Sequence, residues 1–344
     1  MADGAFDPAR VAEALLGAPV DAVVPLRTSG RNSRLYRVQA GAEAFCLKHY
    51  VARSGVDQRD RLGTEMGALE LMESQGISCV PRPLARSTAF GCALMSWVEG
   101  QPVGRPDEQD IDAALDFLAR IHASSRCVAA ANQPLASEAC LSGAEIVTQL
   151  SQRQNRLAAV ARDDDALAAF LERFSRFLAE RILPPLEQRY RAMGLSAAEA
   201  LPASLRSLCP SDFGFHNALR DAGGLVFLDF DYFGWDDPVK LVCDFLLHPG
   251  MELSEGLKRR FAMGAQRVYG ADSTFAPRLN LLFALFALRW CLILLNEFLP
   301  ERWAIRLHAG FQDDWSRVKR IQLKRAEKLF DLTESIFPCC PYDL

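Results

Sequence analysis

Hydrophobic and polar residues alternate along the first hundred positions in the manner of short strands. Residues 23–30, 33–40 and 43–50 cluster β-branched and aromatic side chains and are separated by glycine-containing turns. Residues 80–87 and 91–100 have a similar texture. A period of two turns one face of each strand toward a core, so the pattern predicts a small antiparallel sheet.

One main helix accompanies this predicted sheet. Between residues 59 and 76, apolar side chains recur three or four positions apart, at Leu62, Met66, Leu69 and Met72. Gly76 follows as a helix stop. A shorter helix is predicted after Asp7 and Pro8, which read as an N-cap and a first-turn proline.

The pattern changes to a helical period after residue 107. Five long helices are predicted, over residues 107–122, 144–160, 165–183, 278–299 and 313–337. Within this region only residues 218–234 suggest a hairpin, with its turn at 221–224. The predicted organisation is therefore an N-terminal lobe over 1–95, a linker over 96–102 and a helical C-terminal lobe over 103–344.

Composition and charge narrow the class of protein. The 344 residues are 50% hydrophobic and 24% charged, as in a soluble globular protein, and the net charge is -4. So small a charge provides no footprint for nucleic acid or for an anionic membrane, so neither is expected as a partner. The apolar tract 281–295 is interrupted by Arg289 and is too short for a membrane span, so a buried core helix is expected.

The ten cysteines and the N-terminus indicate a compartment. The cysteines lie mostly in apolar runs, without the spacing of a zinc site. Free thiols in a reducing cytoplasm are the simpler interpretation. The first ten residues lack the features of a signal peptide, so a cytoplasmic location is expected.

Two features of the N-terminal lobe are candidates for phosphate binding. The turn between the first strands leaves backbone N–H groups that can face an anion, because Gly30 carries no side chain. A plain hairpin turn explains the same residues. Lys48 lies inside an apolar strand, where an ammonium needs a charge partner or a route to solvent, and Glu65 on the next helix can supply the partner.

Carboxylates gather in the region of the predicted hairpin. Asp212 and Asn217 lie five residues apart in an irregular loop, and Asp229 and Asp231 follow the apolar run 225–228. Asp and Asn are ordinary turn residues. However, an Asp beside a substrate hydroxyl can accept its proton, and carboxylate and amide oxygens are ligands for magnesium.

The order of these features resembles the aminoglycoside phosphotransferase and choline kinase branch of the protein-kinase-like fold. That family has a His-Gly-Asp-x-x-x-x-Asn loop, then Ile-Asp-Trp/Phe-Glu/Asp and Gly-Asp-Pro. Here residues 211–217, 228–231 and 235–238 fill those places, and the resemblance covers about residues 20–250. It implies an α+β fold of two lobes: a small antiparallel sheet with one main helix, and a larger, mainly helical lobe.

The resemblance also implies roles for individual residues. Asp212 would accept the proton of the acceptor hydroxyl, and Asn217 and Asp229 would hold Mg²⁺, with Asp231 in an additional metal role. Lys48 would neutralise the nucleotide phosphates while Glu65 fixes its position. The nucleotide would also meet the glycine turn and the interlobe strand, at Ser29, Gly30, Arg31, Asn32, Ser33, Met95, Ser96 and Val98. Asp237 would cap a helix and brace the loop.

The sequence departs from the family at one place. Pro210 and Ser211 stand where the family has His and Gly before the catalytic Asp. That His supports the metal segment, and His216 is not expected to replace it from its different part of the loop. The departure leaves open a catalytically weak relative that binds nucleotide or has a regulatory role.

The expected activity is transfer of the γ-phosphate of ATP, with Mg²⁺, to a hydroxyl of a small molecule. An aminoglycoside, choline, a sugar and a nucleoside-like acceptor stay equally open, as do a monomer and a homodimer. GTP is a less favoured donor than ATP. A cationic acceptor has candidate contacts in Asp231, Asp236, Trp290 and Trp303, although core packing explains the two tryptophans better. A zinc enzyme, a serine hydrolase and a dinucleotide fold lack their motifs.

Overall fold

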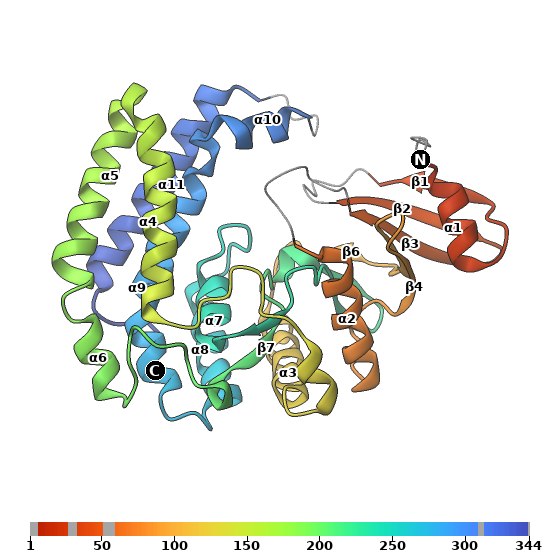
Figure 1. The fold of residues 1–344 in the computed structure, drawn as a ribbon, viewed down its shortest axis with the longest axis horizontal. Coiled ribbons are helices and arrows are strands. Elements are labelled where there is room, and N and C mark those ends of the chain that lie inside the picture. Colours follow the sequence, from red (N-terminus) through yellow and green to blue (C-terminus); the bar gives the residue numbers. More distant parts are fainter. Residues whose placement is uncertain (1–5, 27–32, 51–58, 309–312, 343–344) are drawn as a thin grey trace. The chain divides into compact units, whose positions relative to one another are not determined.

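The computed structural model describes residues 6–26, 33–50, 59–308 and 313–342 (Figure 1). It contains two compact units, each formed by two stretches of chain. Unit 1 comprises residues 1–137 and 208–235, and unit 2 comprises residues 138–207 and 236–344. Unit 1 includes the predicted N-terminal lobe together with the catalytic-loop region. The predicted lobe boundary at 96–102 therefore stays a prediction.

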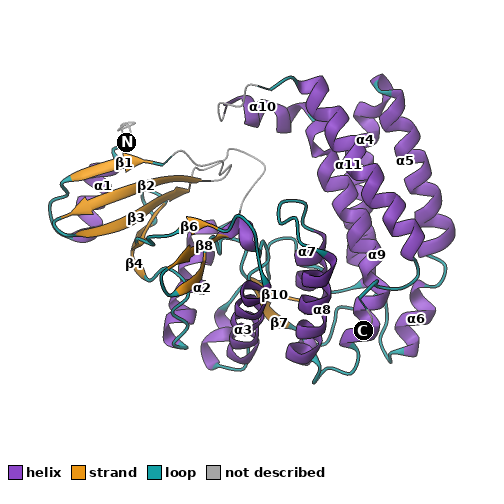
Figure 2. Ribbon diagram, turned by 180° about the vertical axis from the view of Figure 1, so that it is seen from behind, coloured by secondary structure: helices purple, strands orange, loops and turns teal. Residues whose placement is uncertain are grey.

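Unit 1 contains a five-stranded antiparallel sheet in the order β1-β2-β3-β5-β4, shown in orange in Figure 2. Its strands are β1 (Ala22–Pro25), β2 (Ser33–Ala40), β3 (Glu43–Tyr50), β4 (Pro83–Ser87) and β5 (Cys92–Ser96). This confirms the predicted sheet. The register places Lys48 on the inner strand β3, between Leu35 of β2 and Ala93 of β5.

Both helices predicted in this part of the chain are present: one precedes β1, and the other lies between β3 and β4. In α1 (Pro8–Leu16), the Asp7 carboxylate accepts from the backbone N–H groups of Ala9 and Arg10, and Val11 is buried in the sheet's core cluster. The second helix, α2 (Arg61–Ser74), has Asp60 as its N-cap. Gly76 then adopts a φ of 68°, the left-handed conformation that ends helices.

The remainder of unit 1 contains the elements around the candidate catalytic loop, residues 211–217. Helix α3 (Glu108–Ser124) begins with a capping box between Asp107 and Asp110. Strands β8 (Ala218–Asp221) and β9 (Gly224–Phe227) form the predicted hairpin, with residues 222–223 as the turn. Short strands complete this part: β6 (Gln101–Pro102) pairs with β8, and β7 (Ser207–Cys209) pairs with β10 (Gly234–Asp236).

Unit 2 is helical, with α9 (Phe275–Leu294) at its centre (Figure 2). Helices α4 (Gly143–Val160), α7 (Pro238–Leu247) and α11 (Trp315–Ile336) pack against it. Residues 275–298 are long and apolar enough to cross a membrane, but 78% of an apolar 18-residue window within them is buried, as expected for a core helix. The other helices are α5 (Asp165–Phe177), α6 (Leu186–Ala192), α8 (Glu255–Tyr269) and α10 (Pro300–His308).

Gly234 in β10 gives a stability prediction for the segment that follows the candidate metal residues. A Cβ at this position would lie 2.4 Å from the Pro134 carbonyl oxygen and 2.5 Å from the Ala136 nitrogen. Both are backbone atoms, so Gly234→Ala should destabilise the protein by about 3 kcal/mol. Thermal unfolding measures this, with Gly104→Ala, which meets nothing within 4 Å, as the control. Equal Tm values for the two variants would contradict the prediction.

Candidate active site

Lys48 is the centre of the candidate site. Its side chain is 6% exposed, and its Nζ donates to Glu65 Oε2 at 2.6 Å and to Asp229 Oδ1 at 2.6 Å. Burial alone would lower the pKa of this ammonium. The two carboxylates outweigh burial and raise the Lys48 pKa above its usual range. The structure therefore brings together three predicted residues from three separate segments, with Lys48 in its charged form.

Glu65 is held on the buried face of α2. The Tyr50 hydroxyl donates to the same Oε2 at 2.5 Å, and the Phe230 backbone N–H approaches Oε1 at 3.4 Å. Burial, reinforced by the Glu65 charge, raises the Tyr50 pKa well above its usual value, so the hydroxyl keeps its proton and stays a donor. Tyr50 was not predicted as a site residue, although it follows Lys48 by two positions on the same strand face.

The hairpin brings Asn217 and Asp229 to one end. The ladder of β8 and β9 continues past Ala218 and Phe227, because the Leu228 N–H donates to the Asn217 carbonyl at 2.8 Å. Asp229 comes next, with a φ of 67°. Asp is one of the few residue types that tolerate this left-handed backbone. Two residues twelve positions apart therefore become neighbours through a local turn.

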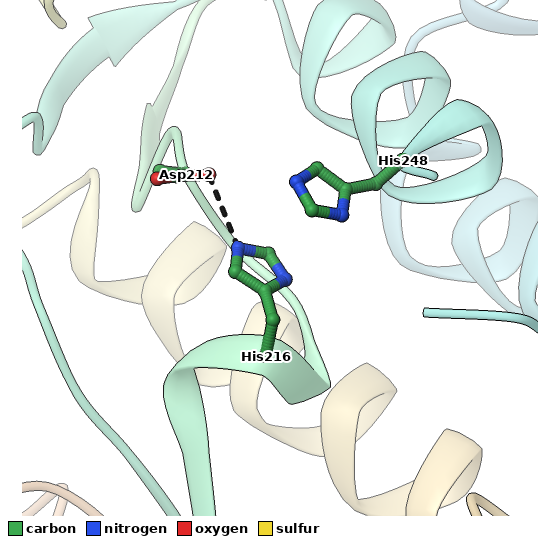
Figure 3. A group of neighbouring side chains, drawn as sticks. All are labelled: Asp212, His216 and His248. Carbon is green, nitrogen blue, oxygen red and sulfur yellow. Dashed lines mark hydrogen bonds and ion pairs between the residues drawn. The ribbon is translucent and has the colours of Figure 1, made fainter. Parts of the chain in front are cut away.

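Asp212 lies in the loop before the hairpin, with a side chain that is 49% exposed. His216 Nε2 is 3.2 Å from its Oδ1 (Figure 3). The Asn217 amide N–H₂ donates to the Asp212 carbonyl at 2.9 Å, which closes the loop on itself. His216 was not predicted to contact Asp212, the candidate catalytic carboxylate. Its position four residues after Asp212 was the only signal available in the sequence.

Asp231 has a different environment from Asp229. Its side chain is buried, and its Oδ2 accepts from Arg61 Nη1 at 2.5 Å. Burial raises the pKa of Asp231 to about 6, and the Asp229 charge acts in the same direction. Arg61 also donates to the Tyr232 hydroxyl at 3.1 Å, and its guanidinium lies 4.7 Å from the centre of that ring.

An aromatic cluster lies beneath the loop and the metal segment. Phe117 of α3 stacks on Phe213 at 5.5 Å and contacts Phe227 at 4.7 Å and Phe230 at 6.1 Å between ring centres. Phe213 and Phe230 each follow a candidate Asp directly in the sequence. Apolar packing therefore fixes the backbone next to both carboxylates, at a loop where the family's supporting His is replaced by Pro210.

The predicted adenine-reading strand borders a cavity of about 570 Å³ within unit 1. Ser96, Trp97 and Val98 line it, together with residues of the loop after α2. The Ser96 N–H donates to the Arg82 carbonyl at 2.9 Å, and Met95 is buried opposite Cys46. Roles for Met95, Ser96 and Val98 in adenine binding stay predictions. The turn residues 29–32 lie outside the described residues, and Ser33 is the first residue of β2.

Three other residues considered in the sequence analysis have structural contacts in the fold. Asp237 caps α7 by accepting from the Val239 N–H at 2.8 Å, as predicted. Asp236 is 1% exposed and accepts from the N–H groups of Cys140 and Asp237, so it is not placed for an acceptor. Trp303 is buried and stacks on Trp315, which confirms core packing.

The donors in unit 1 fit a magnesium ion with a nucleotide. Asp229 offers a carboxylate whose side chain is 45% exposed. The Asn217 amide nitrogen is engaged with the loop, which leaves its oxygen as the ligand atom. Mg²⁺ is usually bound by one or two protein oxygens together with waters and phosphate oxygens. Asn217 and Asp229 are the residues that would hold it.

Comparisons with known proteins agree with this geometry. The phosphotransferase enzyme family model matches residues 23–281. No curated protein sequence matches the chain. Similar solved structures include spectinomycin phosphotransferase, solved with ADP and spectinomycin, at a TM-score of 0.60 and 11% identity over 97% of this chain and 100% of that one. Another is the choline kinase LicA of Streptococcus pneumoniae, at 0.57 and 15% over 94% and 97%.

The fold is thus the protein-kinase-like fold of the aminoglycoside phosphotransferases and choline kinases. The chain belongs to the phosphotransferase enzyme family, because the family model covers well over half of it. Both conclusions confirm the resemblance drawn from the sequence.

Ser211 gives a prediction about the catalytic loop. Its φ of 67° is a conformation that glycine adopts freely and serine does not, which explains the family's Gly at this place. Ser211→Gly should therefore stabilise the protein by about 0.5–1 kcal/mol, the relieved strain less the added chain entropy. Ser211→Ala keeps the strained Cβ and should show no gain. Unfolding by urea tests both, and a gain in the Ala variant would refute the strain argument.

Proposed function

We propose that the protein transfers the γ-phosphate of ATP, with Mg²⁺, to a hydroxyl of a small molecule. The observation that carries this proposal is the buried ammonium of Lys48, 2.6 Å from both Glu65 and Asp229. A fixed cation beside an exposed carboxylate suits a metal–triphosphate ligand, because it meets both the phosphate charge and the metal charge.

Each residue has a defined task in this proposal. Lys48 binds phosphate oxygens, and Glu65 keeps its ammonium in place. Asn217 and Asp229 would hold Mg²⁺, which offsets the charge that develops on the transferring group. Asp212, with an exposed side chain, orients the acceptor hydroxyl and accepts its proton. Because phosphoryl transfer requires little covalent chemistry from the protein, positioning and electrostatics supply the rate enhancement.

The acceptor belongs to the class of hydroxylated metabolites. The names of similar structures include spectinomycin phosphotransferase, choline kinase and ethanolamine kinase. Alcohols that carry an amine are therefore the first compounds to screen. We expect the reaction in the cytoplasm, which supplies ATP and keeps the ten thiols reduced.

A second candidate is a nucleotide-binding protein with little or no transfer activity. The observation that favours it is Pro210, which replaces the family's supporting His. Release of ADP across a panel of aminoglycosides, choline, ethanolamine and sugars separates the two candidates. If no acceptor raises ADP release above the hydrolysis background while ATP still stabilises the protein, the second candidate is correct.

Two substitutions test the division of labour. Asp229→Ala should abolish the Mg²⁺-dependent part of the thermal shift produced by ATP. Asp212→Asn should leave that shift intact and lower kcat by about 10²–10⁴-fold, the usual contribution of general acid–base catalysis. Thermal shift and steady-state kinetics measure these effects, with Asp165→Asn, an exposed residue of α5, as a matched control. An Asp212→Asn variant with unchanged kcat would remove this residue from the mechanism.

A further inference from the structure

The two carboxylates of the metal segment differ sharply in accessibility. The side chain of Asp229 is 45% exposed, whereas that of Asp231 is 3% exposed. A magnesium ion that also binds waters and phosphate oxygens needs a carboxylate that those partners can reach. Asp229 meets this requirement, but Asp231 does not.

The negative charge of Asp231 is already paired with the guanidinium of Arg61. Arg61 Nη1 lies 2.5 Å from its Oδ2, and the Arg61 side chain is itself only 9% exposed. The Asp231 Oδ1 atom is buried and has no hydrogen-bond partner within the described ranges. A metal ion at Oδ1 would be placed close to the guanidinium without a solvent path for its waters, and like charges in a buried setting repel strongly.

Arg61 also has a fixed position in the fold. It is the first residue of α2, and Glu65 lies one turn later on the same buried face. Arg61 bonds Asp231 and Tyr232, while Glu65 contacts the Phe230 N–H and Lys48. Helix α2 is therefore attached at two points to the three residues that directly follow Asp229.

We propose that Asp231 is the anchor of α2 rather than a ligand of Mg²⁺, and that Arg61 is a positioning residue that acts through it. The Arg61–Asp231 pair fixes the first turn of α2, and with it the place of Glu65 and the Lys48 ammonium. This inference rests on the proposed phosphotransfer function and revises the metal role first assigned to Asp231. Arg61 touches no reacting atom.

Stability and positioning can be separated by substituting both partners. Arg61→Met and Asp231→Asn each leave one buried group without its partner, so each should lower the Tm by several degrees. The double variant Arg61→Met/Asp231→Leu removes both charges and should recover most of that loss, because buried ion pairs are often replaceable by apolar residues. In this double variant, however, α2 no longer has the hydrogen-bonded ion pair that fixes the position of its first turn.

Three measurements test the proposal: the Tm, steady-state kinetics with the best acceptor, and calorimetric titration of Mn²⁺ into the protein bound to ADP. The double variant should have a near-normal Tm and keep its Mn²⁺ affinity within about tenfold, since Asp229 and Asn217 are intact. Its kcat should fall about 10–100-fold, as expected for a misplaced phosphate-binding cation. Arg61→Lys should restore part of kcat. Arg59→Met, an exposed arginine whose guanidinium lies 5.0 Å from the Tyr232 ring, should behave as wild type.

Two results would overturn the proposal. If the double variant loses Mn²⁺ affinity as completely as Asp229→Asn, Asp231 is a metal ligand. If Arg61→Met tightens Mn²⁺ binding or adds a second ion, Arg61 competes with a metal for Asp231. Should the wild-type protein phosphorylate no acceptor, the proposed function fails, but the Mn²⁺ titration with ADP still decides the role of Asp231.

Discussion

The burial of one ammonium group constrains the rest of the site. Lys48 lies on the inner strand of the sheet, where a charge without partners would be neutralised by burial. Glu65 and Asp229 keep it charged, and each is itself fixed by the backbone around it. Helix α2 and the left-handed turn at Asp229 present the two acceptors of this cation, and the Tyr50 hydroxyl donates to Glu65 and so holds that acceptor in place.

The candidate catalytic loop is supported by aromatic packing, whereas Lys48 is held by ion pairs with Glu65 and Asp229. Four phenylalanine rings, Phe117, Phe213, Phe227 and Phe230, pack beneath Asp212 and Asp229. Their contribution is apolar burial and ring packing, which require no titratable group. The loss of the family's His at Pro210 is therefore compatible with an ordered loop, since ring packing adds to the hydrogen bond from Asn217 that closes it.

The sequence was sufficient for features that local pattern determines. Alternation predicted the antiparallel sheet, and the hairpin turn at 221–224 placed Asn217 beside Asp229. An interior lysine needs a charge partner or a route to solvent, and Glu65, the candidate partner that the family resemblance also implied, is the partner found. Helix α8 was not among the predicted helices, although its buried residues Phe261, Ala265 and Tyr269 recur at helical spacing.

Features that depend on distant contacts were not predictable. Arg61 and Asp231 are 170 positions apart, and no local pattern relates them. The contact of His216 with Asp212 depends on loop geometry, and the left-handed φ of Ser211 is visible only in the folded chain. Each compact unit is also formed by two separate stretches of the chain, so a single boundary in the sequence cannot divide them.

The hairpin determines which contacts of the candidate site are lost first when the fold loosens. Asn217 and Asp229 are joined by a short local turn, whereas the bond from Lys48 to Asp229 closes a loop of 181 positions. Long loops carry the larger entropic cost of closure, and their contacts depend on every element between them. A local loosening of the sheet therefore separates Lys48 from Asp229 while Asn217 and Asp229 stay together. If these residues have the proposed roles, affinity for nucleotide, more than affinity for metal, reports whether unit 1 is fully folded.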